Sequence, residues 1–143
     1  MTDNGGETGA RSTADRAREN TRNDGETGVL VADDEATVRR LAERMLRRLG
    51  FIPVLCATGE EAVSFLRENP AEVQVAIVDM VMPGMQGSEC ADRLRNLCPS
   101  LKVVLATGQK PDSDSEAVEK ADAVLQKPYS VQSLEAILSD LVD

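Results

Sequence analysis

The sequence predicts an α/β fold in which a doubly wound parallel sheet of five strands carries helices on both faces. Two observations lead to this prediction. Short apolar runs recur along the chain, and each is followed by a segment whose apolar residues repeat with helical spacing. Because the apolar runs do not alternate with polar residues, both faces of each strand are expected to be covered. Right-handed crossover connections then give the doubly wound arrangement.

The five expected strands are short, and β-branched residues, which favour extended backbone, recur in them. Val29-Leu30-Val31-Ala32 is continuously apolar and stops abruptly at Asp33 and Asp34. The third run likewise stops at an acid, Asp79. Strands are expected over residues 29–32, 52–56, 73–78, 102–106 and 123–125.

Five helices are expected from apolar stripes and from residues that begin or end helices. Apolar residues recur at i, i+3, i+4, i+7 and i+8 from Val38, and Gly50 stands where that helix would end. Thr58 and Glu61 have the spacing of a capping box at the start of the second helix, and Ser130 precedes the last one. The expected helices cover about residues 36–49, 59–68, 88–97 and 113–120 and the segment after Ser130.

Residues 1–28 differ in composition from the rest of the chain. Their apolar residues are Met1, Ala10, Ala14 and Ala17. So small an apolar content cannot offset the conformational entropy that is lost on folding. We therefore expect residues 1–28 to be a disordered arm or linker and residues 29–143 to form one domain.

Composition excludes several classes of function. The chain has no histidine, so it contains no histidine general base, no Ser/His/Asp or Cys/His triad and no imidazole metal ligand. With 16 Lys and Arg against 25 Asp and Glu, its net charge is -9, which argues against nucleic acid or an anionic membrane surface as the main partner. No window approaches about 18 consecutive apolar residues, so no membrane insertion is expected.

Polar residues collect where the expected strands end. Asp33 and Asp34 follow the first strand, Asp79 the third, Thr107 the fourth and Lys127 the fifth. In a doubly wound fold the ligand site lies beyond the carboxyl ends of the strands, so these residues are expected to meet. Neighbouring carboxylates favour a shared Mg²⁺, and a hydroxyl with an ammonium suits a phosphoryl group. Because this set holds no Ser, Cys or His, a carboxylate is the expected nucleophile, giving an acyl phosphate.

Four motifs hold these residues, in order, each at the end of an expected strand. They are Val31-Ala32-Asp33-Asp34-Glu35, Asp79-Met80-Val81-Met82-Pro83-Gly84-Met85-Gln86-Gly87, Leu105-Ala106-Thr107-Gly108 and Lys127-Pro128-Tyr129. Over residues 29–143 the sequence thus resembles a response-regulator receiver domain of two-component signal transduction. The resemblance implies the flavodoxin-like (βα)5 fold of chemotaxis receivers, with strand order 2-1-3-4-5.

The resemblance also implies a metal site. The ion would be Mg²⁺, or Mn²⁺ in its place. Its ligands would be the side chains of Asp34 and Asp79 and the backbone carbonyl of Val81, while Asp33 would act on it through water.

The resemblance further implies phosphotransfer. The domain would take a phosphoryl group from a partner's phosphohistidine onto Asp79, with Thr107 and Lys127 on the phosphoryl oxygens, and would act as a signalling switch. It would catalyse its own phosphorylation and slow dephosphorylation rather than turn over a substrate as an ordinary enzyme does. The peptide between Lys127 and Pro128 is expected to be cis. The chain is expected in the cytoplasm, as a single-domain response regulator or as the receiver of a hybrid histidine kinase.

Arginines are concentrated on the first expected helix, opposite its apolar stripe. They are Arg39, Arg40, Arg44, Arg47 and Arg48. The plain interpretation is a solvated helix face with local pairing to Glu43. In the receiver family this helix docks on a histidine-bearing helical bundle, so the resemblance implies that a histidine kinase or histidine phosphotransfer protein docks here.

Two positions depart from the family's pattern. Val124 stands where many receivers have an aromatic residue that moves on activation, and Lys120 stands where a glycine often closes the fourth helix.

Two other functions remain open. One alternative is a phosphorylation-independent interaction module on the same fold, against which the intact acidic site argues. Another is a flavodoxin-like cofactor binder, which is disfavoured because acids crowd the edge where an anionic cofactor would bind.

Overall fold

The computed structural model describes residues 27–108 and 120–142. Residues 1–26 of the expected arm (1–28) and residues 113–119 of the expected fourth helix (113–120) lie outside these ranges, and Gly28, the last residue of the expected arm, is the first residue of β1. The elements are β1 (Gly28–Ala32), α2 (Ala36–Arg48), β2 (Ile52–Cys56), α3 (Gly59–Glu68), β3 (Val75–Asp79), α4 (Gly87–Leu97), β4 (Lys102–Thr107), β5 (Ala123–Gln126) and α6 (Val131–Val142).

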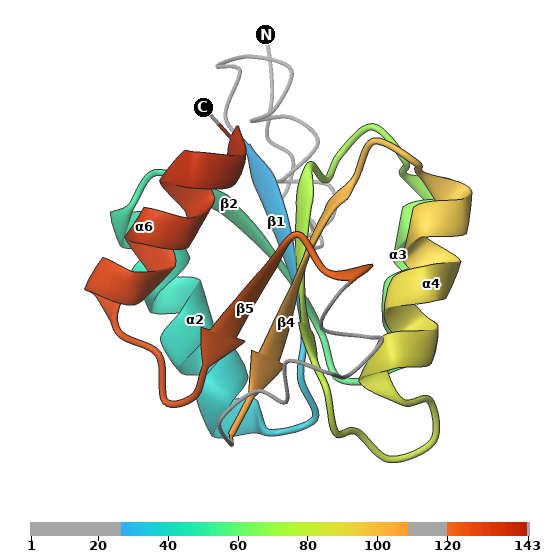
Figure 1. The fold of residues 1–143 in the computed structure, drawn as a ribbon, viewed down its shortest axis with the longest axis horizontal. Coiled ribbons are helices and arrows are strands. Elements are labelled where there is room, and N and C mark those ends of the chain that lie inside the picture. Colours follow the sequence, from blue (N-terminus) through green and yellow to red (C-terminus); the bar gives the residue numbers. More distant parts are fainter. Residues whose placement is uncertain (1–26, 109–119, 143) are drawn as a thin grey trace, which may run out of the picture.

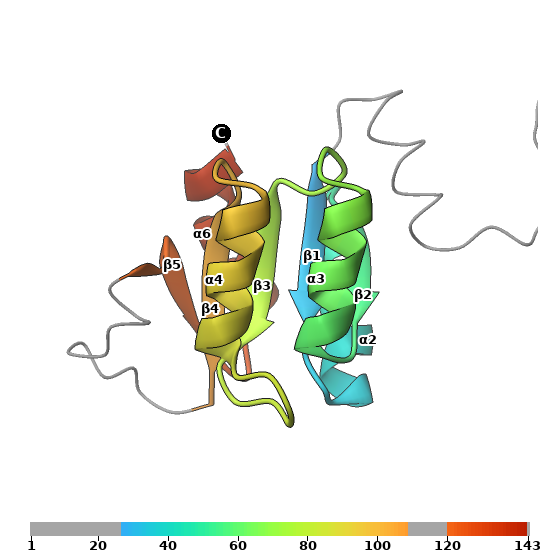
Figure 2. The same cartoon turned by 90° about the vertical axis from the view of Figure 1, so that its right-hand side faces the viewer.

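The five strands form one parallel sheet in the order β2-β1-β3-β4-β5. Helices α2 and α6 cover one face of this sheet, and α3 and α4 cover the other (Figure 1). In the view turned by 90°, α3 and α4 lie side by side in front of the strands (Figure 2). The expected doubly wound fold and its strand order are confirmed.

The sheet separates two apolar cores, and successive residues of each central strand contribute to opposite cores. In β1, Val29 and Val31 pack with the apolar residues of α2 and α6, while Leu30 and Ala32 pack with those of α3 and α4. All four side chains are at most 1% exposed. Because both faces of the strand are buried, it contains no polar alternation, as the sequence predicts.

Helix ends are formed by the residues that the sequence indicates. The Thr58 Oγ1 accepts a hydrogen bond from the Glu61 N–H at 3.0 Å, and Glu61 Oε1 accepts one from the Ala57 N–H at 2.7 Å. Gly50, just beyond α2, has φ +92°, a conformation that glycine adopts without a steric penalty. Ser130 Oγ accepts the Ser133 N–H at 3.1 Å at the start of α6. These residues mark the end of α2 and the starts of α3 and α6.

Strand β3 begins at Val75, two residues later than the apolar run suggests. Gln74, just before it, ties three chain segments together. Its side-chain Oε1 accepts the Gly28 N–H at 2.8 Å, its own N–H donates to the Gly28 carbonyl, and its carbonyl accepts the Lys102 N–H. Gln74, the polar residue within the apolar run, therefore closes the amino end of the sheet.

In the part of the chain that the structure describes, no helix is long and apolar enough to cross a membrane.

Gly87 opens α4 at a point where the helix touches the end of β3. A Cβ atom built on Gly87 would lie 2.6 Å from the Met80 Cα and closer still to the Asp79 carbonyl oxygen. Backbone atoms cannot move aside as a flexible side chain can. Gly87 is thus required by the close approach of two backbones.

We predict that Gly87→Ala destabilises the domain by about 1–3 kcal/mol, because the added methyl forces the start of α4 away from β3. The free energy of unfolding from urea denaturation is the measurement. Gly108→Ala is the matched control, because a Cβ built on Gly108 meets nothing within 4 Å. Equal stability of the two variants would show that the close approach at Gly87 carries no constraint.

Candidate functional site

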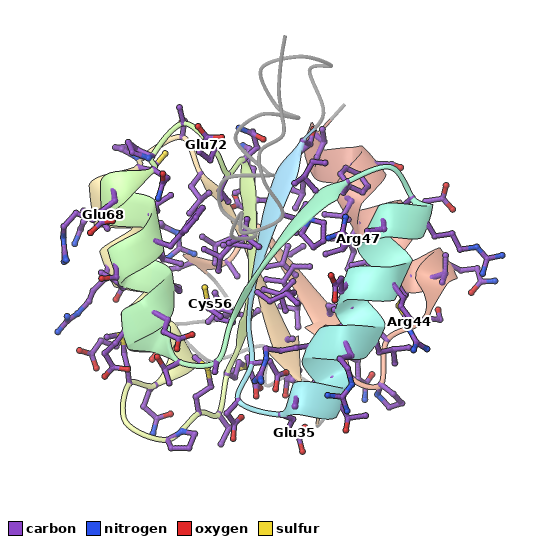
Figure 3. All side chains as sticks on the ribbon, turned by 180° about the vertical axis from the view of Figure 1, so that it is seen from behind. Glu35, Arg44, Arg47, Cys56, Glu68 and Glu72 are labelled. Carbon is purple, nitrogen blue, oxygen red and sulfur yellow. The ribbon has the colours of Figure 1, made fainter. Side chains whose placement is uncertain are left out.

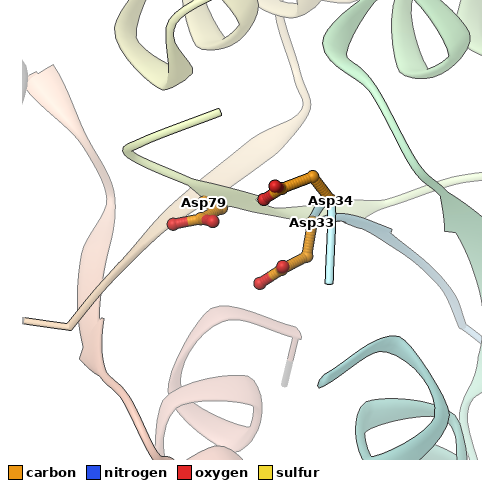
Figure 4. A group of neighbouring side chains, drawn as sticks. All are labelled: Asp33, Asp34 and Asp79. Carbon is orange, nitrogen blue, oxygen red and sulfur yellow. The ribbon is translucent and has the colours of Figure 1, made fainter. Parts of the chain in front are cut away.

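Three carboxylates meet at the carboxyl ends of β1 and β3. Asp33 and Asp34 follow β1, and Asp79 is the last residue of β3. Each offers an oxygen, and these oxygens lie within 4.8 Å of one another (Figure 4). Asp33 and Asp79 are 2% and 5% exposed, whereas Asp34 is exposed to solvent. The sheet explains the meeting, because β1 and β3 are adjacent and Ala32 pairs in register with Val78.

Lys127, just after β5, lies between the two buried acids. Its Nζ is 3.1 Å from Asp33 Oδ2 and 3.3 Å from Asp79 Oδ2, with Glu35 Oε1 at 3.8 Å. Burial by itself lowers the pKa of Lys127, but the hydrogen bond and charge of Asp33, together with Asp79, outweigh it and hold the pKa above its usual value. The ammonium therefore stays charged at neutral pH. The peptide between Lys127 and Pro128 is cis, as expected.

Asp79 is an acid whose ionised form is disfavoured. Burial, followed by the negative charge of Asp33, raises the pKa of Asp79 above its usual value. Lys127 and the Val81 N–H, which donates to Asp79 Oδ1 at 3.4 Å, oppose this increase. A further positive charge close to Asp79 would therefore stabilise its ionised form.

Asp33 is hydrogen-bonded through both its backbone and its side chain. Its N–H donates to the Cys56 carbonyl at 3.1 Å, and its Oδ1 accepts the Glu35 N–H at 2.9 Å. Its Oδ2 accepts from Lys127, and its backbone carbonyl accepts from Arg39 Nη1 at 2.7 Å. The sequence interpretation grouped Arg39 with the docking arginines. The structure instead places its guanidinium on the backbone beside the acidic site.

Thr107 is the last residue of β4 and is half-buried. Asp79 pairs in register with Ala106, and the Ala106 carbonyl accepts the Met80 N–H at 2.9 Å, so Thr107 stands one residue beyond the partner of Asp79. The Thr107 carbonyl accepts the Lys127 N–H at 2.7 Å. The backbone thus brings the ends of β3, β4 and β5 to one edge. Val81, two residues after Asp79, has 76% of its surface exposed.

A pocket of about 310 Å³ adjoins the acidic cluster on the side of α2. It lies between the first turns of α2 and the segment after β5, and Leu41 at its side is 44% exposed. Burial, followed by the charges of Asp33 and Asp79, raises the pKa of the Tyr129 hydroxyl. The residues that line the pocket are Glu35, Val38, Leu41, Gly108, Lys127, Pro128 and Tyr129.

The other four arginines of α2 are exposed, unlike Arg39. Arg47 forms an ion pair with Glu43 at 3.2 Å, as the solvated-face interpretation predicts. Arg44 and Arg47 are labelled on α2 in Figure 3. Within residues 27–108 and 120–142, Arg40, Arg44 and Arg48 form no ion pair or hydrogen bond through their side chains.

The donor set fits a hard divalent cation. Carboxylate and carbonyl oxygens are the ligands that Mg²⁺ prefers, and it usually keeps several waters, for which the exposed Asp34 leaves room. Burial and then the charge of Asp33 raise the pKa of Asp79, and a cation between the carboxylates would relieve the repulsion from Asp33. The acidic site therefore suits Mg²⁺ in the chemistry of its donors.

Comparisons with known proteins agree with this geometry. Residues 29–139 match the family model described as the response regulator receiver domain. The response regulator receiver protein CpdR of Brucella abortus is 32% identical over 111 residues, which are 74% of this chain and 88% of CpdR. The sensor kinase CckA of Brucella abortus is 30% identical over 122 residues, 83% of this chain but 13% of CckA.

The autoinducer 1 sensor kinase/phosphatase LuxN of Vibrio campbellii is 28% identical over 113 residues, and the match again spans 13% of the longer protein. The chain thus corresponds to about an eighth of these sensor kinases. Among solved structures, the Vibrio cholerae chemotaxis protein CheY4 has the same fold, with a TM-score of 0.74, 23% identity and coverage of 82% of this chain and 99% of CheY4.

A receiver domain from Clostridium thermocellum gives a TM-score of 0.74 at 26% identity, covering 81% of this chain and 94% of that one. Receiver domains occur both in response regulators and in sensor kinases, as CpdR and CckA illustrate. The family match, the fold and the acidic edge of the sheet lead to one assignment. The chain belongs to the response regulator receiver domain family of two-component signalling.

Proposed function

We propose that this receiver takes a phosphoryl group from a partner's phosphohistidine onto Asp79 in a Mg²⁺-dependent reaction, and that the phosphorylated form acts as a signalling switch. The observation that supports this most directly is the setting of Asp79. It is a buried carboxylate with two further acids within 4.8 Å and an ammonium at 3.3 Å. That arrangement suits a group that arrives with several negatively charged oxygens.

Four residues would hold the metal, with either Mg²⁺ or Mn²⁺ in the site. Both carboxylate oxygens of Asp33 already accept hydrogen bonds, from the Glu35 N–H and from Lys127. These bonds, at 2.9 and 3.1 Å, are shorter than the contacts of the Asp79 oxygens with the Val81 N–H and Lys127, at 3.4 and 3.3 Å. The difference favours Asp34, Asp79 and the Val81 carbonyl as direct ligands and supports contact of Asp33 through water. When bound, the cation neutralises charge on the phosphoryl oxygens.

The chain's own residues carry the transfer. A carboxylate oxygen of Asp79 forms a bond to phosphorus as the bond from phosphorus to the partner's imidazole nitrogen breaks, and that nitrogen keeps the electron pair. Lys127 and the Thr107 hydroxyl bind the phosphoryl oxygens. Water later attacks the phosphorus, the bond to the Asp79 oxygen breaks, and inorganic phosphate leaves while Asp79 returns to its ionised form. The protein is modified and restored in this cycle, so it works as a switch.

The partner is a histidine kinase or a histidine phosphotransfer protein that docks on α2. Arg40, Arg44 and Arg48 offer three exposed positive charges to an acidic surface. The pocket beside Leu41 offers an apolar patch next to the acidic cluster. A partner helix that contacts both these arginines and the pocket would bring its histidine to Asp79.

A phosphorylation-independent interaction module on the same fold remains the second candidate, and labelling separates the two. We predict that acetyl phosphate with Mg²⁺ adds about 80 Da to the protein, as one phosphoryl group does, and that Asp79→Asn abolishes the adduct. Intact-mass spectrometry is the measurement. Omission of Mg²⁺ is the control. A folded wild-type protein that takes up no phosphoryl group would favour the interaction module.

We predict that Asp79→Asn stabilises the metal-free protein at pH 7. The pKa of Asp79 is raised in the folded state, so its ionisation at neutral pH costs stability, and an amide removes this cost. The advantage should shrink as the pH falls through the raised folded-state pKa and vanish below about 4, where the carboxyl becomes protonated in the unfolded chain as well.

Urea denaturation in EDTA at pH 7 and pH 4 measures this difference. Saturating Mg²⁺ should stabilise the wild type more than Asp79→Asn, because ligand binding to the folded state alone adds to its stability. If the asparagine variant is the less stable one in EDTA at pH 7, or if Mg²⁺ shifts both proteins equally, the acidic site does not work as proposed.

We predict that reversing the charges of Arg44 and Arg48 to Glu slows phosphotransfer from the partner at least tenfold, which corresponds to about 1.4 kcal/mol. Labelling by acetyl phosphate should not change, because neither arginine lies at the acidic cluster. Arg47→Glu in the same assays is the control for helix charge, since Arg47 already pairs with Glu43. Equal loss with both phosphodonors would locate the defect in the site and refute docking through α2.

A further inference from the structure

Arg39 has a different environment from the other arginines of α2. It is half-buried, and its Nη1 donates to the Asp33 carbonyl oxygen at 2.7 Å, a short charge-assisted hydrogen bond. Arg40, Arg44, Arg47 and Arg48 are exposed. The guanidinium also lies close enough to β2 to lower the pKa of Cys56 slightly against its burial. Arg39 therefore points back over the carboxyl edge of the sheet.

The atom that Arg39 binds has a geometric consequence. The Asp33 carbonyl and the Asp34 N–H belong to one planar peptide unit, so fixing the direction of the carbonyl fixes the plane from which Asp34 departs. The Asp33 N–H is already held by the Cys56 carbonyl. With both backbone ends of Asp33 bonded, Asp34 can be exposed to solvent and still be directed toward Asp79.

The side-chain bonds of Asp33 complete the arrangement. The Glu35 N–H holds Oδ1, which tightens the turn between β1 and α2, and Lys127 holds Oδ2. None of these bonds fixes the peptide between Asp33 and Asp34. Among the residues that the structure describes, Arg39 is the one whose hydrogen bond acts on that peptide, and it lies near the start of α2, the helix that follows the turn.

We infer that Arg39 is a positioning residue for the metal site, holding the Asp33–Asp34 peptide in the orientation that turns both carboxylates toward Asp79. The inference rests on the proposed Mg²⁺ site. A positioning role and a pure charge effect predict opposite changes in Mg²⁺ affinity when Arg39 is removed. Loss of a nearby cation alone would strengthen Mg²⁺ binding, whereas loss of the peptide's orientation weakens it.

The test measures Mg²⁺ affinity by isothermal titration calorimetry for the wild type, Arg39→Ala, Arg39→Lys and Arg40→Ala. We expect Arg39→Ala to raise the Kd for Mg²⁺ roughly tenfold or more, in the range found when a group orienting a metal ligand is removed. Arg39→Lys keeps a cationic donor and should recover part of the loss. Arg40→Ala removes the same charge from an exposed neighbour and should stay within about twofold of the wild type.

A second measurement works without metal. Hydrogen exchange of the Glu35 amide, followed by NMR in EDTA, reports the order of the turn, because that N–H is bonded to Asp33 Oδ1. Exchange should be faster in Arg39→Ala than in Arg40→Ala and the wild type. Unchanged exchange, or tighter Mg²⁺ binding by Arg39→Ala, overturns the inference. If the wild type binds no Mg²⁺, the proposed metal site fails, and the amide exchange alone decides whether Arg39 orders the turn.

Discussion

The structure of the acidic edge depends on one ammonium group. Lys127 lies within 3.3 Å of both buried acids, Asp33 and Asp79, and these come from two different strands. Two buried carboxylates without a counter-ion would be strongly destabilising, since burial disfavours charge and like charges repel. The lysine makes their proximity tolerable but leaves them short of one further positive charge. Burial, together with the incompletely neutralised charge of Asp33, raises the pKa of Asp79.

Topology is what makes this balance possible. Lys127 follows β5 at the edge of the sheet, yet it reaches the acids that follow β1 and end β3 near its centre. The backbone bond from the Lys127 N–H to the Thr107 carbonyl anchors the start of this reach on β4. The strand order therefore converts residues that are 94 positions apart in sequence into an ion pair. Rearranging the strands would separate the charges.

Much of this arrangement could be predicted from the sequence. The unbroken apolar runs predict covered strands, and the acids, threonine and lysine at their ends predict a shared site, because strand ends in a parallel sheet meet at one edge. Three features could not be predicted. They are the contact of Gly87 with the end of β3, the closure of the sheet by Gln74 and the bond from Arg39 to Asp33. Each depends on the three-dimensional arrangement, and the local pattern of each residue allows several roles. Arg39 fits the spacing of a solvated helix face as well as its neighbours do, and only the direction of its side chain sets it apart.

The loop between β3 and α4 is joined at its base. The Gly87 N–H donates to the Met80 carbonyl at 3.1 Å, so the chain leaves and returns at nearly the same point. Met82 and Met85 anchor the loop in the core beneath α3 and α4, while Pro83 and Gly84 lie exposed at its outer turn. When the two ends of a loop are hydrogen-bonded to each other, residues added at its tip lengthen the loop without moving its ends. Residues inserted at the outer turn would therefore change the surface beside the site while Asp79 at its base keeps its place. The turn itself keeps a glycine requirement, because Gly84 has φ +83°, where a side chain is strained.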